Sequence, residues 1–149
     1  MVDNELTDED LSAIRDLIQR SELRAIEFHE VSARTLPFDG EPPAQEDANV
    51  SIQLEHRAET KEFGIRMIGS VTNSTKEVRV AVAAEYDMTA GETPVERTIL
   101  MFANEVAVMS LCPYFREGVS SVSAKVFNDP LLLPTIERGM IKYDISDNV

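Results

Sequence analysis

Three segments in the middle of the chain, residues 50–58, 63–71 and 78–86, alternate apolar with polar residues. Alternation with a period of two is typical of strands that bury one face. Short turn-forming sequences, Thr60-Lys61 and Asn73-Ser74-Thr75, separate the three segments. Because a parallel crossover needs about a dozen residues or more, these short connections favour antiparallel pairing in a meander.

A fourth strand is expected over Leu23–Leu36, ahead of these three segments. Its apolar positions have one parity before His29 and the other parity after it, and a β-bulge near His29-Glu30 reconciles the two. Pro37 and the Gly- and Pro-rich residues 39–43 end the strand in an acidic loop. The sequence therefore predicts a four-stranded antiparallel sheet within residues 22–90.

Helices are expected before and after this sheet. Asp8–Arg20 has apolar residues at helical spacing, and Thr7 begins a capping box with an aspartate three residues later. Thr93-Pro94 begins a longer helical pattern, which Pro113 should kink or break. The expected fold class is α+β, in which the long C-terminal helix packs on one face of the sheet and the N-terminal helix is an addition.

The chain is expected to form one domain. Its parts are the N-terminal helix at 7–20, the sheet at 22–90, the helical layer and crossover at 93–134 and a tail at 135–149. The first residues are acidic and lack an apolar signal segment, and no apolar run is long enough to cross a bilayer. The single cysteine, Cys112, suits a reducing compartment. We therefore expect a cytoplasmic protein.

The balance of charge limits the partners. The chain has 27 acidic and 14 basic residues, a formal net charge of −13. A negative field repels phosphate backbones and anionic lipids, which disfavours nucleic acid and membrane surfaces as partners. The same field attracts a basic peptide or a cationic domain.

The residues that usually carry catalysis are few. The only histidines are His29 and His56, the only thiol is Cys112, and neither a zinc motif nor a nucleophile elbow is present. His56 shares the apolar parity of its strand, which is typical of a core or interface imidazole, and Cys112 stands in an apolar stretch, which is typical of an inert thiol. The sequence predicts no cofactor, no metal and no enzyme activity.

Two motifs in the C-terminal third resemble the SecB protein-export chaperone family. Cys112-Pro113-Tyr114-Phe115-Arg116-Glu117 is similar to the family's helical Pro-Tyr-x-Arg-Glu signature, at Pro113, Tyr114, Arg116 and Glu117. Phe127-Asn128-Asp129-Pro130-Leu131-Leu132-Leu133-Pro134 is similar to the Leu-rich loop that follows it. The N-terminal helix has no counterpart in that family, and Thr135-Ile136-Glu137-Arg138-Gly139 stands where its second helix should begin. Such a divergent chain also resembles the SecB-like chaperones that accompany toxin–antitoxin systems.

The resemblance implies an ATP-independent holdase that binds unfolded polypeptides, assembles as a tetrameric dimer of dimers and delivers precursors to the translocation motor SecA. Apolar side chains near the loops are the expected client-binding residues: Leu36, Phe38, Phe127, Leu131, Leu132 and Leu133. Acids of the sheet are the expected motor-docking residues: Glu27, Glu30 and Glu85.

Two other functions remain open at this stage. One is a binding module dedicated to a single partner such as an antitoxin. The other is a small enzyme of hotdog or cystatin-like architecture, which would need His29 or His56 in a pocket.

Overall fold

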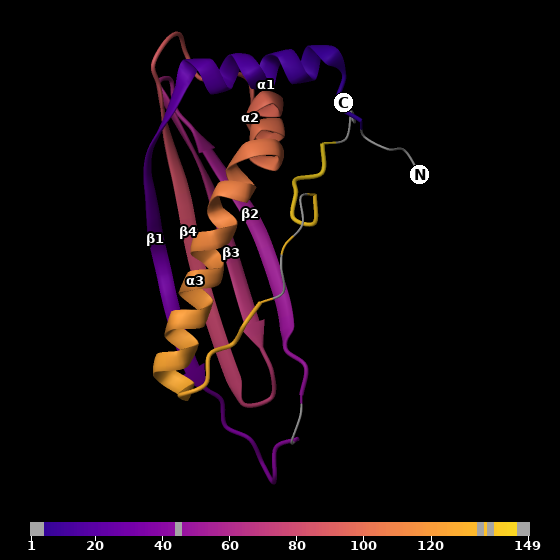
Figure 1. Cartoon of the computed structure of the whole chain (residues 1–149), viewed down its shortest axis with the longest axis vertical. Coiled ribbons are helices and arrows are strands. Elements are labelled where there is room, and N and C mark those ends of the chain that lie inside the picture. The colour runs from indigo at the N-terminus through magenta and orange to yellow at the C-terminus, as the bar shows by residue number, and fades with distance from the viewer. Residues whose placement is uncertain (1–4, 44–45, 134–135, 137–138, 146–149) are drawn as a thin grey trace.

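The computed structural model describes residues 5–43, 46–133, 136 and 139–145. An open sheet forms one layer, a long helix crosses one of its faces diagonally, and a shorter helix lies across one end (Figure 1). The elements in chain order are α1 (Asp8–Arg20), β1 (Ser21–Thr35), β2 (Asn49–Ala58), β3 (Glu62–Thr72), β4 (Lys76–Met88), α2 (Glu96–Phe102), the π-helical turn η1 (Ala103–Ala107) and α3 (Val108–Phe127).

The four strands are antiparallel and have the order β1-β4-β3-β2. The predicted meander is therefore correct for β2, β3 and β4 but wrong for β1, which pairs with β4 instead of β2. Residues 36–48 connect β1 to β2, and this connection is long enough to pass from one edge of the sheet to the other. Since no tight turn links β1 to β2, local sequence does not make them neighbours.

Strand β1 has two register shifts against β4, one between Leu23 and Ala25 and one between Phe28 and Glu30. The second is the bulge expected at His29 from the change of parity, and the first, at Arg24, was not expected. Each bulge places one extra residue opposite β4 without losing the apolar alternation on either side.

The inner face of the sheet, which α3 covers, holds the core. Its strand residues share the parity predicted from the sequence and are all at most 4% exposed: Phe63, Ile65, Met67, Val71, Val78, Val80, Val82, Ala84 and Tyr86. Gly69 breaks this row because the ring of Phe115 fills the space beside it. A Cβ atom at Gly69 would lie 2.2 Å from Cζ of Phe115, so the glycine is a slot for that ring.

Pro113 does not break the long helix, contrary to expectation, because α3 continues through it to Phe127. The irregularity lies earlier, in η1, where the N–H of Val108 donates to the carbonyl of Ala103. Pro113 removes only one backbone donor, and its neighbours Cys112 and Phe115 are buried, so packing holds the helix together across it.

The helix also begins later than predicted, at Glu96 with Val95 as the N-cap residue. Thr93 does not cap it, because its N–H donates to the carbonyl of Thr60 and its hydroxyl donates to the carbonyl of Glu62. The stretch Glu96–Phe127 is long and apolar enough to span a membrane, but 56% of an apolar 18-residue part of it is buried within the fold, as expected of a core helix.

The N-terminal helix is as predicted. Thr7 accepts from the N–H of Asp10, and the Asp10 side chain accepts from the N–H of Thr7, which completes the capping box. The Arg97 guanidinium lies 3.3 Å from the Asp10 carboxylate, which links α1 to α2. The backbone hydrogen bond from Thr7 contributes most to holding the pKa of Asp10 below its usual value.

Candidate functional site

An open pocket of about 350 Å³ lies between α3 and the segment that follows it, and we name it the crossover pocket. Met109, Pro113 and Arg116 line it from successive turns of α3, with Cys112 beside them and Ile136 opposite. Arg116 donates from Nη2 to the carbonyl of Leu133 at 3.2 Å, which fixes the segment against the helix. The arrangement is an apolar hollow with one cation at its rim.

The cysteine in this pocket is not activated. Cys112 is 5% exposed, and burial raises the pKa of its thiol more than the nearby Arg116 lowers it. A protonated thiol is a weak nucleophile, so Cys112 contributes apolar surface.

The apolar residues expected to bind clients separate into two groups. Leu132 is 79% exposed and Phe38 is 41% exposed, so both side chains are available to a partner. Leu36, Phe127 and Leu131 are half-buried.

Leu133 differs from these residues. Leu133 is 8% exposed and belongs to the core, so, contrary to expectation, it does not contribute to an exposed apolar surface. The hydrogen bond from Arg116 to the Leu133 carbonyl explains this burial, because it holds the segment after α3 against the helix. Pro134, the last residue of the matched loop, lies outside the described residues.

The residues of the helical signature lie on both sides of α3. Pro113, Tyr114 and Glu117 are exposed, with Tyr114 at 45%, whereas Phe115 between them is buried. Arg116 is half-buried and is the residue of this group that ties two elements together.

The outer face of the sheet has a different character, since charged side chains of opposite sign lie side by side across the strands. Arg57 of β2 donates to Glu85 of β4 at 2.5 Å, and Arg66 of β3 donates to Glu55 of β2. Glu85 is 6% exposed, so the Arg57 guanidinium compensates a carboxylate that is largely removed from water.

The acids expected to dock a motor are all on this face but are not equivalent. Glu27 and Glu30 are exposed and lie near cations, Glu27 3.5 Å from Nε2 of His29 and Glu30 3.6 Å from Nε of Arg79. Glu85 is buried and paired with Arg57, so, contrary to expectation, it does not present a free negative charge. The outer face of the sheet therefore carries a network of ion pairs and not a continuous acidic surface.

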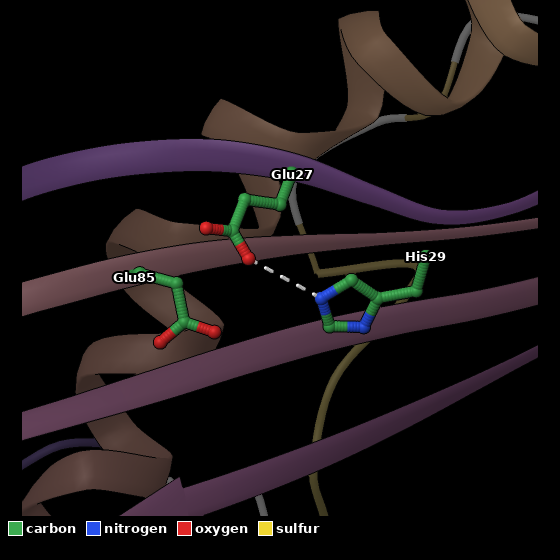
Figure 2. A group of neighbouring side chains, drawn as sticks. All are labelled: Glu27, His29 and Glu85. Atoms are coloured by element: carbon green, nitrogen blue, oxygen red, sulfur yellow. Dashed lines mark ion pairs between the residues drawn. The ribbon is translucent and has the colours of Figure 1, made fainter.

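Glu27, His29 and Glu85 have possible metal-ligand atoms within 4.8 Å of one another, close enough to bind one metal ion (Figure 2). Nδ1 of His29 lies 3.3 Å from the Arg66 guanidinium, which can only donate, so Nδ1 is the acceptor and Nε2 carries the proton toward Glu27. A metal at Nε2 would require the opposite tautomer. Glu85 is already occupied by Arg57, so these side chains fit a hydrogen-bonded ion-pair network better than a metal.

Both histidines line a shallow pocket of about 210 Å³ on this side of the sheet, together with Arg57, Arg66 and Glu85. His56 is also engaged from the other side, where Nε2 lies 3.3 Å from Glu96 and its ring meets the ring of Tyr143 edge-on at 5.7 Å. These contacts place the His56 imidazole between the sheet and the residues that cover it, so of the predicted core or interface positions they correspond to a partly buried one within the chain.

Two residues near His56, Asn104 and Tyr143, were not among the site residues predicted from the sequence. Asn104 lies in η1 and exchanges two hydrogen bonds with the backbone of Tyr143. The signal that points to them is the alternation of apolar and polar residues over Ile141–Ile145, which resembles a short strand.

An open four-stranded antiparallel sheet of order β1-β4-β3-β2, with one long helix across a single face, defines an α+β fold that comparison identifies as SecB-like. No family model matches the chain. The solved structure of the Mycobacterium tuberculosis Rv1957 SecB-like chaperone, in complex with a ChAD peptide from the Rv1956 HigA1 antitoxin, superposes with a TM-score of 0.72 at 21% identity, covering 87% of this chain and 99% of that chain.

The sequence comparison agrees with the fold. The SecB-like chaperone SmegB of Mycolicibacterium smegmatis is 27% identical over 129 residues, which are 87% of this chain and 84% of that protein. In both sequence and fold, the chain is therefore similar to SecB-like chaperones.

Proposed function

We propose that this protein is an ATP-independent holdase that binds unfolded polypeptides and prevents their aggregation. The observation that carries the proposal is the apolar crossover pocket, together with Leu132 of the segment after α3, which is 79% exposed, in a chain with a SecB-like fold. The related chaperone was solved with a peptide bound, which supports polypeptide as the ligand class.

Such a chaperone must expose apolar surface to bind its clients and yet stay soluble itself. Exposed apolar side chains capture unfolded segments by removing apolar surface from water, which contributes roughly 25 cal/mol per Å². The net charge of −13 keeps the chaperone soluble and prevents its non-specific aggregation while it exposes that surface. Binding of this kind needs no covalent step, and we propose none.

Light scattering from a chemically denatured client, diluted into buffer without nucleotide, tests the proposal. We expect suppression near one client chain per assembly, and Leu132→Ser should weaken client binding about tenfold, since a buried leucine contributes on the order of 1.5 kcal/mol. Val95→Ser is the matched control, because Val95 is 72% exposed but lies at the opposite end of the helical layer. Equal scattering with and without the protein, across several clients, contradicts the proposal.

A second candidate is a chaperone dedicated to an antitoxin, and the antitoxin peptide bound to the solved relative favours it. It predicts tight binding to one partner and little effect on general aggregation. Comparing the affinity for the ChAD peptide of the HigA1 antitoxin with the affinity for unrelated denatured clients separates the two candidates.

Delivery to SecA belongs to this proposal as a further step, with Glu27 and Glu30 as docking acids because both are exposed on the outer face. The double substitution Glu27→Lys and Glu30→Lys should weaken SecA binding at low salt. We also propose a cytoplasmic homotetramer, and its mass in solution is measured by multi-angle light scattering.

A further inference from the structure

The segment 139–145 returns alongside the helical layer near β2, far in sequence from everything it touches (Figure 1). Its burial alternates through five residues: Ile141, Tyr143 and Ile145 are half-buried, and Lys142 and Asp144 are exposed. An extended chain that buries every second side chain has this pattern.

Asn104 holds this segment by its backbone. The N–H of Tyr143 donates to Oδ1 of Asn104 at 2.6 Å, and Nδ2 of Asn104 donates to the carbonyl of Tyr143 at 3.0 Å. One side-chain amide thus pairs with both backbone groups of a single residue, as a neighbouring strand would. This contact is independent of the side chain at position 143.

Asn104 projects from η1, the π-helical turn between α2 and α3. Such turns are often found at functional sites, because the extra residue presents a side chain that a regular helix would direct elsewhere. On the other side, His56 of β2 meets the Tyr143 ring edge-on. Tyr143 therefore contacts Asn104 through its backbone and His56 through its ring, and we name the place that the segment occupies between these two residues the Asn104 groove.

The segment fits its groove imperfectly. The Tyr143 hydroxyl is buried with no hydrogen-bond partner among the described residues, which costs roughly 1–3 kcal/mol. A hollow of about 310 Å³ also remains beside the segment, lined by Leu6 and Met101 and also by charged side chains such as Arg97. A different chain could fill this space better.

We propose that the Asn104 groove is an acceptor for an extended polypeptide with apolar side chains at alternate positions, and that residues 139–145 occupy it as an intramolecular competitor. An incoming client segment displaces them and takes over the two hydrogen bonds with Asn104. Backbone pairing with alternating apolar contacts recognises unfolded chains with little regard to sequence. The competitor role rests on the proposed function, since it regulates polypeptide binding.

A labelled synthetic peptide with the sequence of residues 139–145 tests this, with binding to full-length variants followed by fluorescence anisotropy. Tyr143→Ala should release the segment, because it removes the ring that packs against His56 and the core, and this burial contributes more than the Asn104 hydrogen bonds that remain. If the segment occupies the groove for about nine-tenths of the time in the wild type, its release tightens peptide binding about tenfold. Asn104→Ala in addition to Tyr143→Ala should abolish this gain, because the acceptor is lost. Met140→Ala is the matched control within the segment, since Met140 is 63% exposed and does not line the hollow, and this variant should bind as the wild type does.

Equal affinity in wild type and Tyr143→Ala, no binding to any variant, or a gain that survives Asn104→Ala overturns the proposal. Circular dichroism of each variant confirms that the fold is retained. Aggregation assays separate this inference from the proposed function: suppression without the peptide effect refutes the competitor alone, whereas the peptide effect without suppression refutes the holdase alone.

Discussion

The two faces of the sheet are built from the same strands but are held together by different forces. On the inner face, Phe115 fills the slot at Gly69 and apolar side chains exclude water. On the outer face, Glu85 is almost as buried as the core, yet its neighbour is a guanidinium. The comparison shows that one face derives its stability from packing and the other from compensated charge, so the two should respond differently to mutation, salt and pH.

The largest expected effect is on the inner face. Phe115→Ala should lower the free energy of unfolding by about 3–5 kcal/mol, because a fully buried ring leaves a cavity. Gly69→Ala should cost about 1–3 kcal/mol in the wild type, since its methyl group meets the ring. In the Phe115→Ala background the same methyl group enters the cavity, so its cost should vanish. Urea unfolding of the four proteins measures the coupling, and simple additivity would contradict direct contact.

A smaller effect is expected on the outer face. Arg57→Met should cost about 2 kcal/mol, because it leaves the buried Glu85 carboxylate without its cation, although the partial exposure of Arg57 limits the loss. Adding Glu85→Met should restore most of the stability, since neither charge then remains. Arg34→Met is the control: Arg34 is 68% exposed and pairs with Glu77, so its loss should cost less than about 0.5 kcal/mol. A double variant as unstable as Arg57→Met would show that charge compensation is not the cause.

The smallest effect concerns acid. The hydrogen bond from Arg57 is the main reason that the pKa of Glu62 lies below its usual value of 4.5. A carboxylate with a depressed folded-state pKa stabilises the fold above its unfolded pKa, and this stabilisation is lost as pH falls through the folded value. Glu62→Gln should therefore flatten the loss of stability below about pH 4.5, as measured by urea unfolding at a series of pH values. An unchanged slope would place the acid sensitivity elsewhere.

The inner face was predictable from sequence because its information is local. The parity of Phe63, Ile65 and Met67 is visible within one strand, and the change of parity at His29 located a bulge. The capping box of α1 is likewise contained in four residues.

The outer face and the grooves depend on contacts between distant residues, which no local pattern contains. The pairing of Arg57 with Glu85 follows from the order of strands, and the position of β1 beside β4 was itself not predicted. The contact of Asn104 with Tyr143 joins residues 39 positions apart. The break predicted at Pro113 was wrong for a related reason. Burial of the surrounding helix outweighs the one backbone hydrogen bond that proline removes.

Hydrogen–deuterium exchange of the protein with and without an unfolded client tests the central claim most directly, since it shows which face the client covers. We expect protection of α3 near Met109 and of residues 131–133, with faster exchange over 139–145 where the client displaces the segment. We expect no change in the amides of β3 and β4, whose hydrogen bonds lie within the sheet. Protection confined to the outer edge of the charged face, with none near the crossover pocket, would contradict client binding at this pocket.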